Sequence, residues 1–272
     1  MSMWIDRYLV PPDRRVALDE IDPDDAKSLS KKQRTTIETD MQDDLAELRA
    51  LQERLFAEKT RALLIVLLAI DCGGKDSTVD RIFSGINPQS CVVTGFGVPS
   101  DEERAHDFLW RIHHRVPRAG MIGIFNRSHY EDVTVTRVNG SIDRDTGLDR
   151  CRHIRAFERL LHDRGTHVLK FHLRISRKEQ ADRLRDRLED PTKHWKFNPS
   201  DLQGRERWDE HQAAFEDAVN ATSTDDAPWH IVPANSKWYR DAIVTRAIVE
   251  RLRAMDPRYP PPVEGLERYR VE

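Results

Sequence analysis

Residues 69–78 read AIDCGGKDST and come close to the pattern of a phosphate-binding loop. The usual pattern is G-x-x-x-x-G-K-[ST], in which backbone N–H groups surround the phosphates and the lysine reaches the outer ones. Gly74 and Lys75 stand at the expected positions, whereas Asp76 replaces the magnesium-binding Ser or Thr and Asp71 adds a carboxylate inside the loop. The stretch therefore predicts phosphate chemistry with an unexpected negative charge, although its glycine pair also fits a plain strand-to-helix turn.

The acids and the cysteine of this loop predict separate roles. A carboxylate that faces phosphates repels them unless a cation lies between, so Asp71 is expected to be a magnesium ligand or to orient a metal-bound water. Asp76 would lie in the first turn of a helix, where it favours the dipole and can cap free N–H groups. Cys72 lies just before that helix and close to Lys75, a setting that predicts a lowered thiol pKa and the fastest alkylation of the three cysteines.

A second polar group follows another apolar run, in IGIFNRSHYED at residues 122–132. Arg127 would stand at the carboxyl end of a strand and face the loop of Lys75, where a guanidinium can clamp a phosphate through two parallel hydrogen bonds. A structural ion pair of this arginine with Glu131 or Asp132 is the alternative.

A third group is the basic segment that starts near residue 174. Arg183 and Arg187 are four residues apart and hence share one helical face. Lys193 and Trp195 follow in the aperiodic stretch DPTKHWKFNPSD, which predicts a mobile loop. Acidic neighbours make a solvated, salt-bridged helix the commoner explanation of such charge. The tryptophan could stack on a base or pack as local core.

Alternating apolar and amphipathic segments must position these groups. We expect strands at 63–70, 91–96, 121–125, 167–173 and 229–232. We expect helices at 30–59, from 75 to about 84, from 100, 148–162, 176–188, 200–219 and 237–253, with capping boxes at Ser100–Glu103 and Ser176–Glu179. This alternation predicts an α/β fold whose five strands form a mainly parallel sheet covered by helices on both faces.

The bulk composition narrows the function classes. The 272 residues carry 33% charged side chains and a formal net charge of −3, which disfavours indiscriminate nucleic-acid binding. The longest apolar run is about half of a membrane span, and three scattered cysteines fit the cytoplasm. No HExxH spacing and no G-x-S-x-G elbow occur, which disfavours a transition-metal site and a serine hydrolase.

The motifs together resemble type-2 polyphosphate kinases. The resemblance rests on AIDCGGKDST, NPQSCVVTGFGVPSDEERAHDFLWRIH, IGIFNRSHYEDV, DPTKHWKFNPSDL, TSTDDAPWHIVPANSKWYR and the helix ELRALQERLFAE, in order, from about residue 7 to 255. It implies a P-loop kinase-like three-layer α/β/α fold with a helical lid. It also implies magnesium-dependent transfer of a terminal phosphoryl group between inorganic polyphosphate and a nucleotide, in a homo-oligomer (a dimer or a tetramer).

The resemblance also implies roles for individual residues, carried over by position. The implied catalytic residues are Asp71, Lys75, Arg127, Arg183 and Arg187. The implied phosphate-binding residues are Gly73, Gly74, Lys75, Asp76, Ser77, Thr78 and Arg81. The implied nucleotide-binding residues are Asn126, Glu131, Asp132, Lys193 and Trp195, and Asp71 would hold Mg2+ or Mn2+.

Asn126 stands where many members of this family have aspartate, and this form resembles the subgroup that accepts both nucleoside mono- and diphosphates. AMP and ADP are the expected substrates, with GMP and GDP as further candidates. Two positions depart from the family pattern: Cys72–Gly73 replaces a commoner Thr/Ala pair, and Asp80–Arg81 replaces a Lys-His-like pair. The second departure affects one basic contact along the polyphosphate path, which Arg81 could supply instead.

We expect one domain over residues 1–272. Its parts are an arm (1–27), a helix (28–60), a P-loop core (61–255) with a lid at about 177–205, and a tail (256–272). Three rival functions remain: an ATP-dependent nucleoside or nucleotide kinase of the same fold, a nucleic-acid-binding module that uses the basic lid, and a non-catalytic scaffold with a decayed loop. The absence of a nucleic-acid-binding motif argues against the second, and the retained Lys75 and Arg127 argue against the third.

Overall fold

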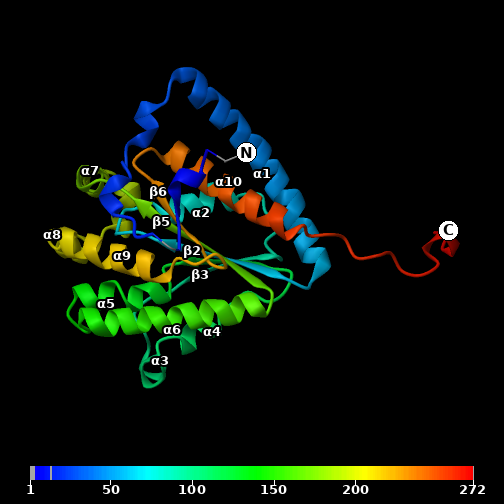
Figure 1. Cartoon of the computed structure of the whole chain (residues 1–272). Helices are drawn as coiled ribbons and strands as arrows, with labels where there is room; N and C mark the ends of the chain where they lie inside the picture. The colour runs from blue at the N-terminus through cyan, green and yellow to red at the C-terminus, as the bar shows by residue number, and fades with distance from the viewer. Residues whose placement is uncertain (1–3, 13, 272) are drawn as a thin grey trace.

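A sheet of six strands lies at the centre of the computed structural model, which describes residues 4–12 and 14–271 (Figure 1). The strands are β1 (Leu9–Val10), β2 (Ala62–Leu68), β3 (Cys91–Gly95), β4 (Ile122–Asn126), β5 (Thr166–Arg174) and β6 (Trp229–Pro233). They lie in the order β1-β6-β5-β2-β4-β3, and all pairs from β6 to β3 are parallel. The α/β fold with five parallel strands is thus confirmed.

The sixth strand, β1, comes from the N-terminal arm. It pairs antiparallel with β6, with Leu9 opposite His230 and Val10 opposite Trp229. The sequence did not reveal it because two residues within a segment rich in Pro and Asp are too short to show a period of two.

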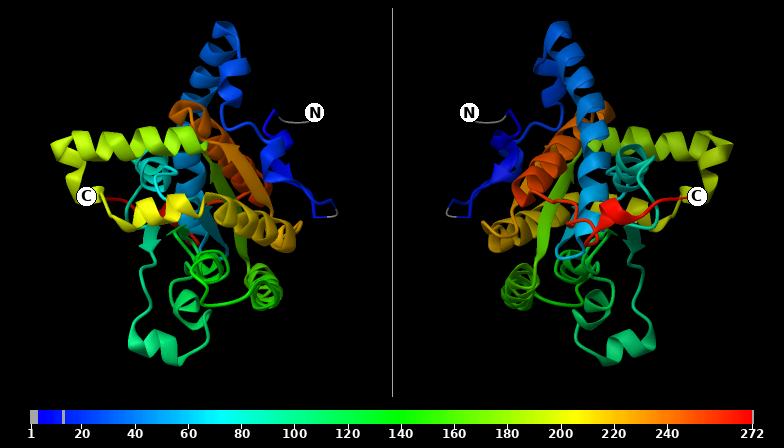
Figure 2. Two further views of the ribbon diagram at one scale, coloured as in Figure 1. Left: turned by 90° about the vertical axis from the view of Figure 1, so that its left-hand side faces the viewer. Right: turned by 90° about the vertical axis from the view of Figure 1, so that its right-hand side faces the viewer.

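Helices cover both faces of the sheet (Figures 1 and 2). One face carries α1 (Lys31–Glu58), α2 (Lys75–Phe83) and α10 (Lys237–Met255), and the other carries α5 (Val135–Val138), α6 (Arg144–Asp163) and α9 (Trp208–Thr222). The short helices α3 (Asp101–Ala105) and α4 (Trp110–His113) lie beyond the second face. The 3-10 helices are η1 (Asp6–Tyr8), η2 (Leu18–Glu20), η3 (Asp25–Ser28), η4 (His129–Asp132) and η6 (Leu266–Arg268).

The remaining elements form a projection at the carboxyl end of the parallel strands. They are α7 (Arg177–Glu189), the 3-10 helix η5 (Pro191–Lys196) and α8 (Ser200–Glu206), and they lie at the left of Figure 1. The C-terminal segment leaves the body on the opposite side. Residues predicted as a loop at 190–201 are therefore largely a 3-10 helix and the start of α8.

The core explains why β2 reads as an unbroken apolar run. All seven residues of ALLIVLL are buried, because the strand has neighbours on both edges and helices on both faces. No helix in the described part of the chain is both long and apolar enough to cross a membrane.

The two predicted capping boxes have different outcomes. At Ser100 the box is complete, since Glu103 N donates to Ser100 Oγ and Ser100 N donates to Glu103 Oε2. At Ser176 only the first half forms. Asn235 Oδ1 accepts from Ser176 N instead, at 2.9 Å, and the Glu179 carboxylate binds an arginine of the next turn. The second prediction was therefore half correct.

The single helix predicted at 200–219 is wrong, because the chain breaks between α8 and α9. Gly204 weakens the helix just before the break. Arg207 leaves helical geometry, and its Nε donates to Glu210 Oε1 at 2.8 Å in the first turn of α9. This break places α8 beside the cavity described below, while α9 packs on the sheet.

Candidate active site

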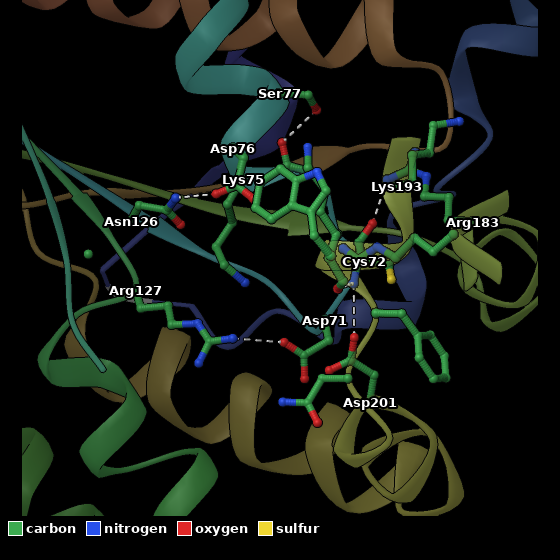
Figure 3. Close-up of a pocket in the computed structure, with 18 of the residues that line it drawn as sticks. Asp71, Cys72, Lys75, Asp76, Ser77, Asn126, Arg127, Arg183, Lys193 and Asp201 are labelled. Atoms are coloured by element: carbon green, nitrogen blue, oxygen red, sulfur yellow. Dashed lines mark hydrogen bonds and ion pairs between the residues drawn. The ribbon is translucent and has the colours of Figure 1, made fainter. Parts of the chain in front are cut away.

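A cavity of about 700 Å³ opens at the carboxyl ends of β2, β3 and β4, the edge at which open α/β sheets bind ligands (Figure 3). Its lining consists of the loop residues Asp71, Cys72, Gly73, Gly74, Lys75, Asp76 and Ser77, the strand ends Gly95, Phe96, Gly97, Asn126 and Arg127, the α7 residues Arg183, Asp186 and Arg187, the lid segment Lys193, Trp195, Lys196, Phe197, Asn198, Pro199 and Asp201, and Lys237. Residues from all three groups singled out in the sequence thus meet in one place.

The phosphate loop turns sharply between β2 and α2. Cys72 and Gly74 both adopt left-handed backbone conformations, with φ of 64° and 100°. The first intrahelical bond runs from Thr78 N to the oxygen of Gly74, so the N–H groups of the preceding turn are free of helical partners. Lys75 Nζ donates to the oxygen of Ala69 at 2.8 Å. N–H groups and an ammonium group held this way can bind an anion.

Both acids of the loop have partners at the carboxyl end of the neighbouring strand β4, in its last residue and in the residue that follows it. Asp71 Oδ1 lies 3.2 Å from Arg127 Nη2, and Asp76 accepts a hydrogen bond from the Asn126 side chain. Asp76 lies in the first turn of α2, as predicted, but α2 has no side-chain cap, so the capping part of the prediction is wrong. The carboxamide of Asn126 takes the place of the backbone N–H as its donor.

Arg127 pairs with Asp71, whereas the sequence had left Glu131 and Asp132 open as its alternative partners. Its backbone is left-handed, with φ of 65°, and this conformation turns the chain from β4 into η4. The side chains of Arg127 and Asp71 are 49% and 39% exposed, so the pair is open to solvent and its partners can be exchanged.

Asp71 and Asp76 have the chemistry to hold a magnesium ion whose other ligands are substrate oxygens and waters. Mg2+ is usually held by one or two carboxylates together with phosphates and waters. Asp71 Oδ1 contacts Arg127, while Oδ2 has no partner within residues 4–12 and 14–271. Those residues contain no cluster of three or more His, Cys, Asp or Glu side chains suited to a metal, so an all-protein cage is not formed there.

Two arginines of α7 connect the projection to the phosphate loop. Arg183 is largely buried, and it donates to the oxygens of Cys72 at 2.9 Å and Ala234 at 2.7 Å. Arg187 Nη1 donates to the oxygen of Lys196 and to Asp201 Oδ2, both at 2.9 Å. Arg183 therefore fixes the position of the loop, while Arg187 ties α7 to the end of η5 and to α8.

The projection presents cations and an exposed ring to the cavity. Lys193 Nζ lies 3.0 Å from Asp190 and 3.4 Å from Asp186. The Trp195 side chain is 79% exposed, and Lys196 Nζ lies 4.9 Å from the centre of its ring. The ring does not pack as local core, which removes one of the two explanations considered for it.

Four of the predicted site residues do not line the cavity. Thr78 is buried and donates to the oxygen of Gly74 at 3.0 Å, and Arg81 is exposed on α2. Asp132 forms a buried pair with Arg111 at 3.1 Å. Burial raises the pKa of Glu131 even though Lys75 and Arg127 lie near it.

Sequence reasoning missed several lining residues, among them Phe96, Asp186, Asp201 and Lys237. Lys237 was detectable, because it follows the carboxyl end of the expected strand at 229–232. Asp201 gave no such signal. Burial and the negative charge of Asp71 raise the pKa of Asp201, and the positive charge of Arg187 opposes this. The effect of Asp71 indicates that the two carboxyl groups lie near each other.

The predicted lowering of the Cys72 thiol pKa is wrong, whereas its relative rate of alkylation stays a prediction. Burial raises the pKa of Cys72 to about 11, and the nearby Arg187 and Arg183 only partly oppose this. Burial likewise raises the pKa of Cys91 to about 11 and of Cys151 to about 12. Cys72 lines the cavity but is only 8% exposed, so the cost of burying a thiolate outweighs the effect of the nearby cations.

Comparisons with known proteins give one consistent result. Residues 29–260 match the family model described as Polyphosphate kinase 2 (PPK2). The chain is 45% identical to the AMP/ADP-polyphosphate phosphotransferase of Meiothermus ruber, over 98% of this chain and 99% of that protein. It is 39% identical to the ADP-polyphosphate phosphotransferase of Rhodopseudomonas palustris, over 77% of each. The crystal structure of polyphosphate kinase 2 from Arthrobacter aurescens superposes with a TM-score of 0.88 at 38% identity, covering 96% of this chain and 95% of that chain.

Proposed function

Because the chain belongs to the polyphosphate kinase 2 family, we propose that it is a nucleotide kinase that uses inorganic polyphosphate as phosphoryl donor, with AMP and ADP as acceptors. The observation that carries this proposal is the convergence of Lys75, Arg127 and the lid cations on one cavity above a phosphate loop. The relative in Meiothermus ruber, similar over nearly the whole chain, supports the choice of both acceptors.

The chemistry is a direct in-line transfer. A terminal phosphate oxygen of the nucleotide attacks the terminal phosphorus of polyphosphate, the bridging P–O bond breaks, and the shortened polyphosphate leaves with the electron pair. Phosphoryl transfer needs positioning and charge stabilisation more than covalent catalysis, so no phospho-enzyme is required. Lys75 and the N–H groups at the start of α2 would bind the transferred group, and Arg127 would clamp it.

The two substrates would approach from different sides of the loop. Trp195 offers an exposed ring on which a base can stack, and Lys193 and Asn126 lie along the same cavity. Gly73, Asp76 and Ser77 would contact the phosphates. Thr78 and Arg81 do not line the cavity, so they would act on the phosphates indirectly. A nucleotide-binding role for Glu131 and Asp132 would likewise be indirect.

We propose that Asp71 holds a divalent cation, Mg2+ or Mn2+, when phosphates are bound. Such an ion, when present, neutralises phosphate charge and orients the transferred group. The free Oδ2 of Asp71 supports this assignment, since it can bind a cation without breaking an existing contact.

The segment from α7 to α8 would serve as a lid within one domain, closing over the substrates and excluding the water that would otherwise hydrolyse polyphosphate. The resemblance also supports a cytoplasmic homo-oligomer, a dimer or a tetramer. Light scattering during gel filtration measures that state directly.

Incubation of the purified protein with ADP, polyphosphate and Mg2+, without added ATP, tests the proposed donor. ATP should form in proportion to the polyphosphate consumed. The same assay with AMP, GMP and GDP maps the acceptors. Phosphorylation of nucleotides only when ATP is supplied would refute the proposal in favour of an ATP-dependent kinase.

A further inference from the structure

Arg240, in the first turn of α10, lies behind the phosphate loop and is almost completely enclosed. Only 1% of its side chain is exposed. Its Nη1 atom is 2.2 Å from the point that a Cβ atom on Gly74 would occupy, so the guanidinium packs directly against this glycine. Gly74 also lines the cavity, whereas Arg240 does not. The loop backbone therefore separates a buried cation from the space in which phosphates are proposed to bind.

The guanidinium of Arg240 is only partly paired. Nε donates to Asp241 Oδ1 at 2.8 Å, and Nη2 lies 2.6 Å from the same oxygen. Nη1 has no hydrogen-bond partner in the described part of the chain. A buried N–H group of a charged side chain is costly to leave unpaired, and each such group in a native protein calls for an explanation.

A second guanidinium approaches the same glycine. Arg183 Nη1 lies 3.3 Å from the Cβ point of Gly74 and donates to the oxygen of Cys72. Burial and the positive charge of Arg183 lower the pKa of Arg240, against the effect of Asp241. Two guanidinium groups thus approach Gly74, Arg240 from behind the loop and Arg183 from the cavity lining, and Lys237 stands one helical turn before Arg240 on the cavity side.

We propose that Arg240 is a positioning residue for the phosphate loop, acting on bound phosphate through Gly74. Its fixed charge lies behind the Gly73–Gly74 backbone and favours the arrangement in which the loop N–H groups point at an anion. Because Nη1 has no acceptor in the described part of the chain, the charge on this side of the guanidinium is not neutralised by a partner and acts on an anion across Gly74.

The enclosure of Arg240 separates this role from direct binding. A side chain with 1% exposure cannot reach a phosphate in the cavity while Gly74 stands between them. The same contact explains why position 74 needs glycine, because φ is 100° and any Cβ would collide with Nη1.

Removing the charge at position 240 tests this inference, which rests on the proposed function. The variants are Arg240→Gln and Arg240→Lys, with Arg246→Gln as matched control. Arg246 lies on the same helix and is also mostly buried, but it pairs with Asp44 at 2.7 Å, on α1 and away from the loop. Both glutamine variants lose an ion pair, so both should be less stable, and only Arg240→Gln should change phosphate binding.

Tripolyphosphate binding is measured by calorimetry without nucleotide, and the KM for polyphosphate and for ADP by steady-state kinetics. We expect Arg240→Gln to weaken tripolyphosphate binding and raise the KM for polyphosphate by about two- to thirtyfold, the range for residues that act on a site without contacting the ligand. The KM for ADP should change less, and Arg240→Lys should recover part of the loss because it keeps the charge.

Tripolyphosphate binding by Arg240→Gln that equals binding by Arg246→Gln overturns the inference. If Arg240→Gln does not fold, Arg240→Lys decides, because it lacks the Nη1 donor and should still raise the KM for polyphosphate several-fold; an unchanged KM overturns the inference. Wild-type protein that makes no ATP from ADP and polyphosphate refutes the proposed function instead, and the calorimetric comparison still tests Arg240.

Discussion

Asp71 and Asp76 lie inside an anion-binding loop, and each has a partner that offsets part of its charge. Asp71 faces a guanidinium, and Asp76 faces the amide of Asn126. An ion pair as exposed as that of Asp71 and Arg127 contributes about 0–1 kcal/mol to stability. Such a pair is easily exchanged, so Asp71 is suited to ligand binding rather than to holding the fold.

The two acids should therefore respond differently to replacement by asparagine. Asp71→Asn is expected to lose most activity and to weaken the dependence of the rate on magnesium, with little change in the melting temperature of the free protein. Asp76→Asn should keep substantial activity, because the new amide can still accept from Asn126. Magnesium titrations of the rate compare the two variants, and an unchanged magnesium response in Asp71→Asn would show that this residue only shapes the loop.

Removal of the Lys75 side chain should lower the activity strongly and leave the fold nearly unchanged. Its ammonium group donates to a backbone oxygen at the edge of the cavity, outside the apolar core. Lys75→Ala is expected to reduce kcat by roughly 10²–10³, the usual effect of removing one preorganised electrostatic donor. Circular dichroism serves as the folding control, and near-normal turnover would remove the loop from the proposed mechanism.

At the scale of elements, a few polar contacts hold the projection of α7, η5 and α8, the proposed lid, in shape. Arg187 joins the end of η5 to Asp201 in α8, and Arg183 joins α7 to the loop. Between these ties, Trp195 extends into solvent. A segment anchored at its ends with an exposed ring in the middle can move toward a ligand without unfolding the core.

Stacking of a base on Trp195 should be measurable. Trp195→Ala is expected to raise the KM for ADP by roughly five- to a hundredfold, since base–aromatic stacking contributes about 1–3 kcal/mol. Trp195→Phe should retain part of this affinity. Leu188→Ala, at another exposed apolar position of the lid region, is the control. A KM for ADP that stays at the wild-type value in Trp195→Ala would place the base elsewhere.

Asp217 links several elements and gives stability a dependence on pH. Its carboxylate contacts Arg144 of α6 at 2.8 Å, Arg137 of α5 at 2.7 Å and Arg15 of the arm at 3.2 Å. Hydrogen bonds from Arg144 and Arg137 lower the pKa of Asp217 to about 2, from 3.8. A lowered carboxyl pKa stabilises the fold above the ordinary value, and this contribution disappears as the pH falls from about 4 toward 2.

The replacement Asp217→Asn should therefore cost about 1–2 kcal/mol at neutral pH, a figure reduced because Arg144 is half exposed. Urea unfolding at pH 7, 4 and 3 should show this difference from the wild type shrinking as the pH falls. Asp225→Asn, at an exposed position, is the control. A difference that stays constant with pH would contradict the assignment.

At the scale of the whole molecule, a buried ion pair joins strand β5 of the sheet to helix α6. Lys170 and Glu158 are 0% and 2% exposed, and Lys170 Nζ also donates to the oxygen of Thr222 at 2.8 Å. Tyr130 donates to Glu158 at 2.8 Å, which connects this pair to the 3-10 helix that follows Arg127. The cluster thus supports the turn that carries a proposed catalytic residue.

Removal of one partner of this pair should lower the free energy of unfolding more than replacement of both partners by apolar residues. Lys170→Met leaves a buried carboxylate without its cation and is expected to cost about 3–5 kcal/mol. The double variant Lys170→Met/Glu158→Leu should cost less than the sum of the single changes, because no uncompensated charge remains. Urea unfolding of the wild type, both single variants and the double variant gives the coupling energy, and simple additivity would argue against a coupled pair.

The parts that the sequence predicts well are those governed by local rules. Strands buried on both faces read as apolar runs, and a glycine pair followed by lysine marked the loop, so β2, α2 and the position of Lys75 followed directly. Interactions between distant segments were not predictable in the same way. The pairing of Asp132 with Arg111, the burial of Cys72 and the approach of Arg240 to Gly74 depend on how elements far apart in the chain pack together.

The contact between Asp71 and Arg127 couples the binding of a phosphate to the binding of a cation. The carboxylate occupies the guanidinium that an incoming phosphate needs, so a phosphate arriving alone must compete with Asp71. A cation arriving alone can bind the free Oδ2 of Asp71, but it shares that carboxylate with Arg127. When both are bound, the phosphate draws Arg127 away and the cation holds the whole carboxylate, so each is expected to raise the affinity of the other by the same factor. The loop should therefore fill with phosphate and cation together more readily than with either alone.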